Sequence, residues 1–228
     1  EQGTKTRISV LPTGLDRVSF QYDEMLSSEI RNMYGNGCPY LFATTARLEK
    51  EKNLDFLFQG TARLRDILGQ DFRLMVIGAG TERRHLEALA RMLGISRQIV
   101  FTGKIENTRV RHYLNAADAF LFASKSETQG IVLLEAMAAG CPVAAVRASG
   151  VVDVVRQGIN GYMTEEAPEA FAAAAARLVL ERGVWSGMSE EARKTAELYE
   201  SGRIAALAAE QYGLMTGQKE DAGYEEHG

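Results

Sequence analysis

Residues 118–143 have the sequence DAFLFASKSETQGIVLLEAMAAGCPV, the strongest structural signal in the chain. After Asp118, the residues up to position 123 are all apolar, which is typical of a strand covered on both faces. From Gly130 the residues are apolar on every side of a helical wheel, until Gly140 and Pro142 end the helix. The stretch therefore predicts a buried strand, a polar loop and a buried helix.

Two glutamates in this stretch are candidates for chemistry. Glu135 is the only charge of the predicted helix, and an ionised carboxylate in apolar surroundings is costly unless it has partners. We therefore expect it to face a polar cleft, a cation or the hydroxyl groups of a ligand. Glu127 lies in the loop before the helix. The backbone N–H groups of residues 129–132 lack intrahelical partners, and with the helix dipole they suit a phosphate group.

Short apolar runs and helical patterns alternate through residues 39–165. We expect strands at 39–46, 72–77, 98–101, 119–122, 142–146 and 161–164, the last at an edge, and helices at 54–68, 81–93, 108–117, 130–139 and 151–157. Thr81 is expected to cap the second of these helices. Strands and helices that alternate with short connections predict an α/β fold, a Rossmann-like, doubly wound and mostly parallel sheet.

The ends of the chain have a different character. Residues 1–38 predict a linker, with a short strand at 7–11, a turn at 12–14 and a helix at 20–33. Residues 166–216 predict extra C-terminal helices, at 168–181, 185–200 and 203–215. The last segment, 217–228, predicts a disordered acidic tail.

Composition excludes several classes of protein. The 228 residues are 46% hydrophobic and 25% charged, enough for one large domain or a domain with an appendage. A net charge of -4 argues against nucleic acid as a partner. No stretch approaches the ~20 apolar residues of a membrane span, and the first residues lack the apolar core of a signal peptide. With only Cys38 and Cys141, we expect a reduced, cytoplasmic protein.

Strand-to-helix loops hold the ligands of open parallel sheets, so these loops are the candidate sites. In residues 47–53, Arg47 and Lys52 follow a strand, and both cations could reach a diphosphate. A solvated charged loop explains the same spacing equally well.

Two further loops contain glycines. Gly78 and Gly80 would let a ligand approach the backbone, but Arg83 stands where a dinucleotide fingerprint has its third glycine, so NAD is disfavoured. Residues 101–105 could border a nucleobase, although a simple turn explains them too.

Four motifs carry a family resemblance in their order and spacing. They are Arg47-Leu-x-x-Glu51-Lys52-Asn53, Val76-Ile-Gly78-x-Gly80-x-Glu82, Phe101-x-Gly103 and Glu127-x-x-Gly130-x-x-x-x-Glu135-Ala136-Met137-Ala138-x-Gly140-x-Pro142-Val143. With them, residues 7–162 resemble the C-terminal, donor-binding half of the retaining GT-B glycosyltransferases of family four.

The resemblance implies a nucleotide-sugar site and a role for each motif. It implies that Arg47 and Lys52 bind the diphosphate and that Glu135 binds the ribose. It implies that Glu127 and the amides of Thr128, Gln129, Gly130 and Ile131 face the sugar and its phosphate. The base would be bordered by Phe101, Gly103 and Ile105, and the ligand would pass beside Gly78 and Gly80. It further implies sugar transfer with retention at the anomeric carbon and without a metal or other cofactor, because the cations and the helix dipole stabilise the departing diphosphate. The segment Ser149-Gly150-Val-Val-Asp153 departs from the family's glycine pair followed by Glu, so contacts from it are less secure.

The resemblance also predicts a missing partner. GT-B enzymes place the active site between two Rossmann-like domains, so we expect an N-terminal acceptor domain that these residues do not contain, and an isolated piece that holds the donor without transferring it. The terminal helices would then expose apolar surface and favour self-association. Residues 126–130 resemble the subgroup that glucosylates diacylglycerol from UDP-sugars, which would place the protein at the inner membrane face through the missing domain.

Two other functions stay open at this point. One is a GT-B-like sugar-nucleotide epimerase, and the other is a dinucleotide-binding or non-catalytic nucleotide-binding module. His85 and His112 lie within predicted helices without acids spaced for a metal, so we expect no metal site. The pair Arg83-Arg84 is expected on a solvated helix face.

Overall fold

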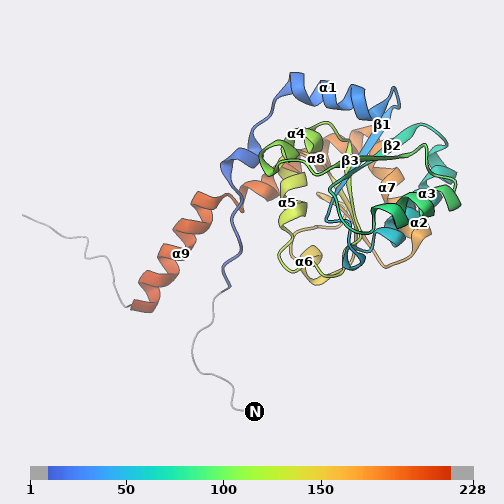
Figure 1. Ribbon diagram of the computed structural model, residues 1–228. Helices are drawn as coiled ribbons and strands as arrows, with labels where there is room; N and C mark the ends of the chain where they lie inside the picture. The colour runs from blue at the N-terminus through green and yellow to red at the C-terminus, as the bar shows by residue number, and fades with distance from the viewer. Residues whose placement is uncertain (1–9, 217–228) are drawn as a thin grey trace, which may run out of the picture.

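The computed structural model describes residues 10–216, and its centre is a six-stranded parallel sheet (Figure 1). The strands are β1 (Tyr40–Thr45), β2 (Phe72–Ile77), β3 (Ile99–Gly103), β4 (Ala119–Phe122), β5 (Val143–Val146) and β6 (Gly161–Thr164). Their order across the sheet is β3-β2-β1-β4-β5-β6, and all neighbouring pairs are parallel. The sheet therefore winds outward in two directions from β1 and β4, as the doubly wound prediction requires.

Helices cover both faces of this sheet. They are η1 (Arg17–Phe20), α1 (Glu24–Gly35), η2 (Lys50–Lys52), α2 (Leu54–Leu68), α3 (Arg83–Met92), α4 (Asn107–Asn115), α5 (Ile131–Ala138), α6 (Ser149–Val152), α7 (Pro168–Leu180), α8 (Arg182–Glu197) and α9 (Ser201–Thr216). One core layer lies between the sheet and α2, α3 and α7. The other lies between the sheet and α1, α4, α5 and α8.

The burial of strand β4 explains its continuous apolar sequence. All four of its residues are buried. Ala119 and Leu121 belong to one core layer, whereas Phe120 and Phe122 belong to the other. Since neighbouring side chains of a strand point to opposite faces, only a continuous apolar run can serve both layers.

The N-terminal segment differs from the prediction. Residues 7–9 lie outside the described range, and Val10 and Leu11 are not in a strand. The expected helix at 20–33 is divided into η1 and α1. The side chain of Asp23 accepts a hydrogen bond from the Leu26 N–H at 3.0 Å, so α1 begins after this N-cap.

Two other helix boundaries were also wrong. Helix α3 begins at Arg83 rather than Thr81, because the Thr81 hydroxyl donates to Glu49 Oε2 at 2.7 Å instead of capping its own helix. The helix expected at 151–157 ends at Val152. There the N–H of Arg156 donates to the side chain of Asn160 at 2.8 Å, which replaces a helical partner.

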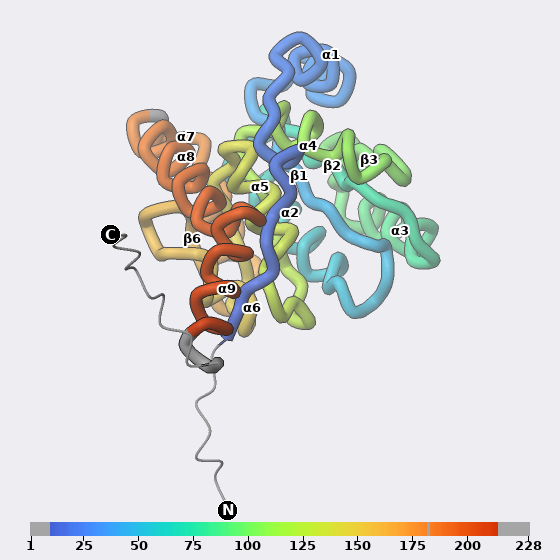
Figure 2. The backbone as a smooth tube through the Cα atoms, turned by 90° about the vertical axis from the view of Figure 1, so that its left-hand side faces the viewer, coloured from blue at the N-terminus to red at the C-terminus, as the bar shows by residue number. Residues whose placement is uncertain are grey.

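The C-terminal helices divide into two kinds. Helices α7 and α8 pack on the body, whereas α9 extends away from it beside the N-terminal segment (Figures 1 and 2). Leu15 holds these two segments together, since its N–H donates to Tyr199 O at 2.6 Å and its carbonyl accepts from Ser201 N at 2.9 Å. The predicted tail at 217–228 lies outside the described residues.

Candidate functional site

The loops that follow β1 and β4 meet at the edge where the sheet changes winding direction. Because β1 and β4 are adjacent and parallel, both loops leave the same edge. The side-chain amide of Asn53 donates to Ala123 O at 3.2 Å, and Ser126 Oγ lies 3.5 Å from Glu51 O. The structure therefore brings residues 47–53 next to residues 124–130, at the position where open α/β sheets bind ligands.

The two cations of the first loop differ in their surroundings. Arg47 is largely exposed and pairs with Glu51 at 3.2 Å within its own loop. Lys52 is half-buried at the end of η2, and its ammonium group has no hydrogen-bond or ion-pair partner within residues 10–216. An ammonium group at a sheet edge without a protein partner is available to an anionic ligand.

Glu127 occupies part of the anion site that the sequence predicts. Its Oε1 accepts hydrogen bonds from the N–H groups of Gln129, at 3.2 Å, and Gly130, at 2.9 Å. Helix α5 begins at Ile131, and in the described chain the N–H groups of Ile131 and Val132 have no partner. Only the last two of the four expected donors are therefore free for a phosphate.

The loop after β5 packs against this turn and supports it. Gly130 adopts a φ of 69°, and a Cβ there would lie 2.7 Å from Gly150 O. Gly150 N–H and Ser149 Oγ both donate to Glu127 O, at 3.1 and 3.3 Å. Residues 149–153, which depart from the family pattern, therefore contact the loop of residues 124–130 that carries Glu127, here called the glutamate loop.

Glu135 lies on α5, one helical turn behind these donors. Its side chain is half-buried, burial raises the pKa of its carboxyl group, and within residues 10–216 it has no hydrogen-bond or ion-pair partner. It borders a cavity of about 20 Å³, room for roughly one water molecule, between α5, α4 and η1.

None of the residues lining that cavity belongs to the loop of Arg47 and Lys52. Glu135 therefore lies in a separate part of the site and does not share its cavity with Arg47 and Lys52. A ligand that contacts all three must be extended along the edge of the sheet.

The two glycines after β2 have a structural explanation. A Cβ on Gly78 would lie 1.9 Å from Ala46 O, and one on Gly80 would lie 2.4 Å from Leu48 O. Leu48 also exchanges backbone hydrogen bonds with Ala79 and Glu82, at 3.1 and 2.9 Å. The space that we expected for a ligand is filled on this side by the loop after β1.

The residues expected around a base lie on opposite faces of the sheet. The Phe101 ring packs near Phe58, with ring centroids 6.1 Å apart, and lies 4.1 Å from the Arg83 guanidinium. Ile105 packs into the other core layer, the one that contains α5. Phe101 belongs to β3, whereas Ile105 lies beyond the end of that strand, in the loop before α4, and of the two only Ile105 is on the Glu135 side. Arg83 covers an aromatic ring instead of being merely solvated.

Gly103 links these loops through its backbone. With a φ of 77°, it accepts a hydrogen bond from the Gly78 N–H at 3.0 Å, and the space on its Cβ side is open. The open side leaves the backbone at Gly103 accessible.

Sequence reasoning missed several residues of this region. Glu166, just before α7, accepts from Asn53 at 2.7 Å and pairs with Lys125 in the glutamate loop. Thr13 Oγ1 donates to Gln129 Oε1 at 2.9 Å, so the N-terminal segment also reaches this loop. Arg111 borders the cavity beside Glu135.

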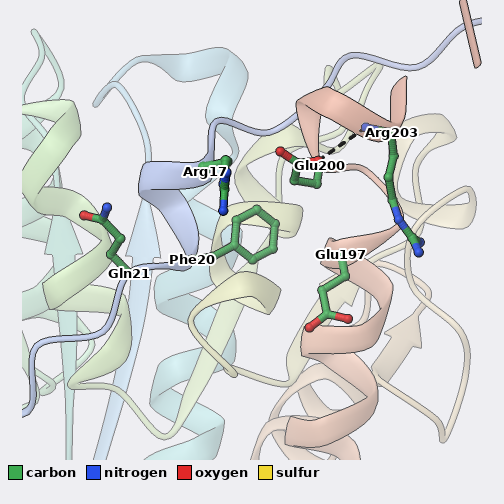
Figure 3. A pocket seen from close by; sticks show the side chains of 6 residues that line it. All are labelled: Arg17, Phe20, Gln21, Glu197, Glu200 and Arg203. Atoms are coloured by element: carbon green, nitrogen blue, oxygen red, sulfur yellow. Dashed lines mark hydrogen bonds between the residues drawn. The ribbon is translucent and has the colours of Figure 1, made fainter. Parts of the chain in front are cut away.

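A larger hollow lies elsewhere in the described part of the molecule. Figure 3 shows this hollow of about 600 Å³ between η1 and the junction of α8 and α9. It is lined by Arg17, Phe20, Gln21, Glu197, Glu200 and Arg203. Its two acidic and two basic residues balance in charge, and Glu200 already accepts from the N–H groups that begin α9. The hollow therefore has no preference for an anionic ligand.

His85 and His112 occupy positions with a structural explanation. His85 Nε2 lies 2.8 Å from Asp55 Oδ2, and that contact raises the pKa of the imidazole. His112 is buried, which lowers its pKa. Within residues 10–216, no three potential ligands gather into a metal site, and no helix has the length and apolar character needed to cross a bilayer.

Comparison with known families gives a match over most of the chain. Residues 29–196 match the sequence model of the family described as "Glycosyl transferases group 1". This range includes all of the strands and the four motifs.

Curated relatives agree with this match and are longer than the chain. D-inositol 3-phosphate glycosyltransferase of Acidothermus cellulolyticus is 31% identical over 76% of this chain and 40% of that protein. Alpha-monoglucosyldiacylglycerol synthase of Streptococcus pneumoniae is 34% identical over 62% of this chain and 33% of the relative. The chain thus spans less than half the length of these relatives.

Solved structures share the fold. The Anabaena protein HepE in complex with UDP superposes with a TM-score of 0.79 at 20% identity, covering 88% of this chain and 56% of that one. The C-terminal domain of a glycosyl transferase group 1 family protein (LpcC) from Francisella tularensis gives a TM-score of 0.72 at 22% identity. That match covers 82% of this chain and 99% of the domain, so the same architecture exists as a separately crystallised unit.

Proposed function

The chain belongs to the glycosyl transferases of group 1, and from this premise we propose that it is the donor-binding half of a retaining hexosyltransferase. The donor is a nucleotide sugar, with UDP-glucose as the first candidate, and the acceptor is a lipid or a glycan. The observation that carries the proposal is the meeting of residues 47–53 with the loop before α5 at one edge of the sheet, with Glu135 one helical turn further along α5.

The diphosphate lies between the first loop and α5. Lys52 has no partner within the described residues, and the N–H groups of Ile131 and Val132 are free, so these three groups bind it directly. Arg47 also binds the phosphate oxygens. To do so it gives up its exposed ion pair with Glu51, and this costs little because exposed ion pairs are weak.

The nucleoside lies between α4 and α5. Ribose hydroxyls donate to the Glu135 carboxylate and offset the desolvation that raises its pKa. The base lies against Ile105 and the open backbone at Gly103. An extended nucleotide therefore explains why Glu135 and the two cations occupy separate places along the edge.

Glu127 and the turn that it closes face the sugar. In the free protein its carboxylate holds the N–H groups of Gln129 and Gly130, which a sugar hydroxyl or phosphate oxygen can take over. The carboxylate is then released to accept from another hydroxyl of the sugar, and Thr128 lies on the same turn. Binding of the donor exchanges one set of hydrogen bonds for another.

The cations and the positive end of the α5 dipole stabilise the negative charge of the departing diphosphate. We propose that no metal or other cofactor takes part. The acceptor pocket and the remaining catalytic side chain come from a further domain of the whole enzyme, so residues 1–228 bind the donor without transferring its sugar. With a lipid acceptor, that enzyme works in the cytoplasm at the inner face of the membrane.

Thermal unfolding with different nucleotides tests the proposal. UDP or UDP-glucose at a hundredfold excess over Kd should add about 2.7 kcal/mol to the free energy of unfolding. GDP is the comparison that identifies the base. Glu135→Gln keeps the shape but weakens the acceptor, so it should reduce the shift. Stabilisation by NAD alone would refute the proposal and favour a dinucleotide module.

A further inference from the structure

The cavity beside Glu135 also contains a cation without a counterion. Arg111 on α4 and Glu135 on α5 both line it, together with apolar residues and the polar side chains of Ser19 and Asn107. Yet the two charged side chains form no ion pair, and neither pairs with another charge in the described part of the chain. Two opposite charges therefore border the same small space without contact.

The hydrogen bonding of Arg111 is incomplete. Its Nη1 donates to the Thr108 carbonyl on the preceding turn of α4. Its Nε is buried and has no partner. A buried N–H without an acceptor costs about 1–3 kcal/mol, so a group that supplies the acceptor would be bound favourably.

Chemistry restricts what this group can be. It must donate to a carboxylate and accept from a guanidinium, and a water molecule or the ligand hydroxyl that displaces it does both. A carboxylate or phosphate would be repelled by Glu135, and an ammonium group has no acceptor for Arg111. The cavity of about 20 Å³ has room for roughly one oxygen atom.

The position fits the nucleoside. The bond to Thr108 directs the Arg111 guanidinium toward the first turn of α4, which directly follows the loop that holds Gly103 and Ile105. A sugar attached to a base at that loop must pass between α4 and α5. Its hydroxyls are therefore the ligand groups that reach the space between Arg111 and Glu135.

We propose that Arg111 is a specificity-determining residue: one ribose hydroxyl bridges Arg111 and Glu135, so the chain distinguishes ribonucleotides from deoxyribonucleotides. This inference rests on the proposed function, because it requires a nucleotide at this site. It adds a residue of α4 to the recognition of the donor and assigns it to one hydroxyl.

Calorimetric titration of the whole chain with UDP, 2′-deoxy-UDP and 3′-deoxy-UDP provides the test. For the unchanged chain, loss of the bridging hydroxyl should raise Kd about thirtyfold, and loss of the other hydroxyl should raise it less. In Arg111→Met the thirtyfold penalty should fall to about threefold. Arg109→Met, an exposed arginine on the same helix, is the matched control and should keep the full penalty.

Each outcome decides the question. Equal affinity of the unchanged chain for all three nucleotides, or an undiminished penalty in Arg111→Met, would overturn the inference. If Arg111→Met fails to fold by circular dichroism, Arg111→Lys decides by the same ratio, since it keeps the charge but loses the planar fork. Failure to bind either UDP or GDP would instead reject the proposed function. If Glu135→Gln weakens UDP binding but the deoxynucleotide penalty is unchanged in Arg111→Met, this inference alone is rejected.

Discussion

Glu166 accepts a hydrogen bond of 2.7 Å from Asn53, a residue 113 positions earlier in the chain. The same carboxylate pairs with Lys125, and the two contacts lower its pKa. Asn53 also donates to Ala123 O. Glu166 therefore connects three loops at the edge of the sheet where the donor is proposed to bind.

Replacing Glu166 should separate its two roles. Glu166→Gln keeps an acceptor for Asn53 but releases Lys125, so UDP should bind two- to threefold more tightly at low salt, with the gain screened at 1 M salt. Glu166→Ala also removes the acceptor and should weaken binding. Titration at both salt concentrations measures this, and equal effects of the two substitutions would show that only the lost charge matters and that the acceptor for Asn53 does not.

Gly78 should not tolerate a side chain. In Gly78→Ala the added Cβ would overlap Ala46 O, so the free energy of unfolding should fall by about 3 kcal/mol. Gly187→Ala is the control, because nothing lies within 4 Å of a Cβ at that helical position. It should be neutral or stabilising by up to about 1 kcal/mol. Urea denaturation compares the two, and a tolerated Gly78→Ala would mean that the loops can separate.

The His85–Asp55 contact should make stability depend on pH. Asp55 raises the pKa of His85, so the folded protein favours the charged imidazole. This contribution is fully present below the unfolded pKa of about 6.5 and is lost as pH rises through the higher folded value. Asp55→Asn should therefore lower the melting temperature at pH 5.5 but leave it unchanged at pH 9. A difference that stays constant with pH would contradict the assignment.

Glu127 should oppose a bare diphosphate and favour one that carries a sugar. Because its carboxylate caps the start of α5, Glu127→Ala should cost about 1 kcal/mol of stability. The same change frees two N–H groups and removes a negative charge, so UDP should bind more tightly. UDP-glucose should lose the sugar contact and gain less. The ratio of the two dissociation constants is the readout, and an unchanged ratio would place Glu127 outside the sugar site.

Much of the fold follows from local sequence. The bounds of α2, β2 and β4 were predicted correctly, since each has a strong period or a continuous apolar run that fixes its type. The same run in β4, followed by the apolar α5, predicted the loop of Glu127 between them, whereas the point where the sheet changes winding direction came from the structure. Boundaries such as Thr81 were wrong because a residue distant in sequence, Glu49, competes for the capping hydroxyl.

The sequence by itself determined the strand and helix pattern, the parallel sheet, the loops that carry Arg47, Lys52 and Glu127, and the helix that carries Glu135, because these depend on spacing along the chain. Only the tertiary structure decided that Gly78 packs against a neighbouring loop and that Arg111 shares a cavity with Glu135. Both relationships join segments that are distant in sequence. Their geometry is set by how the helices pack on the sheet, which no local pattern of residue types encodes.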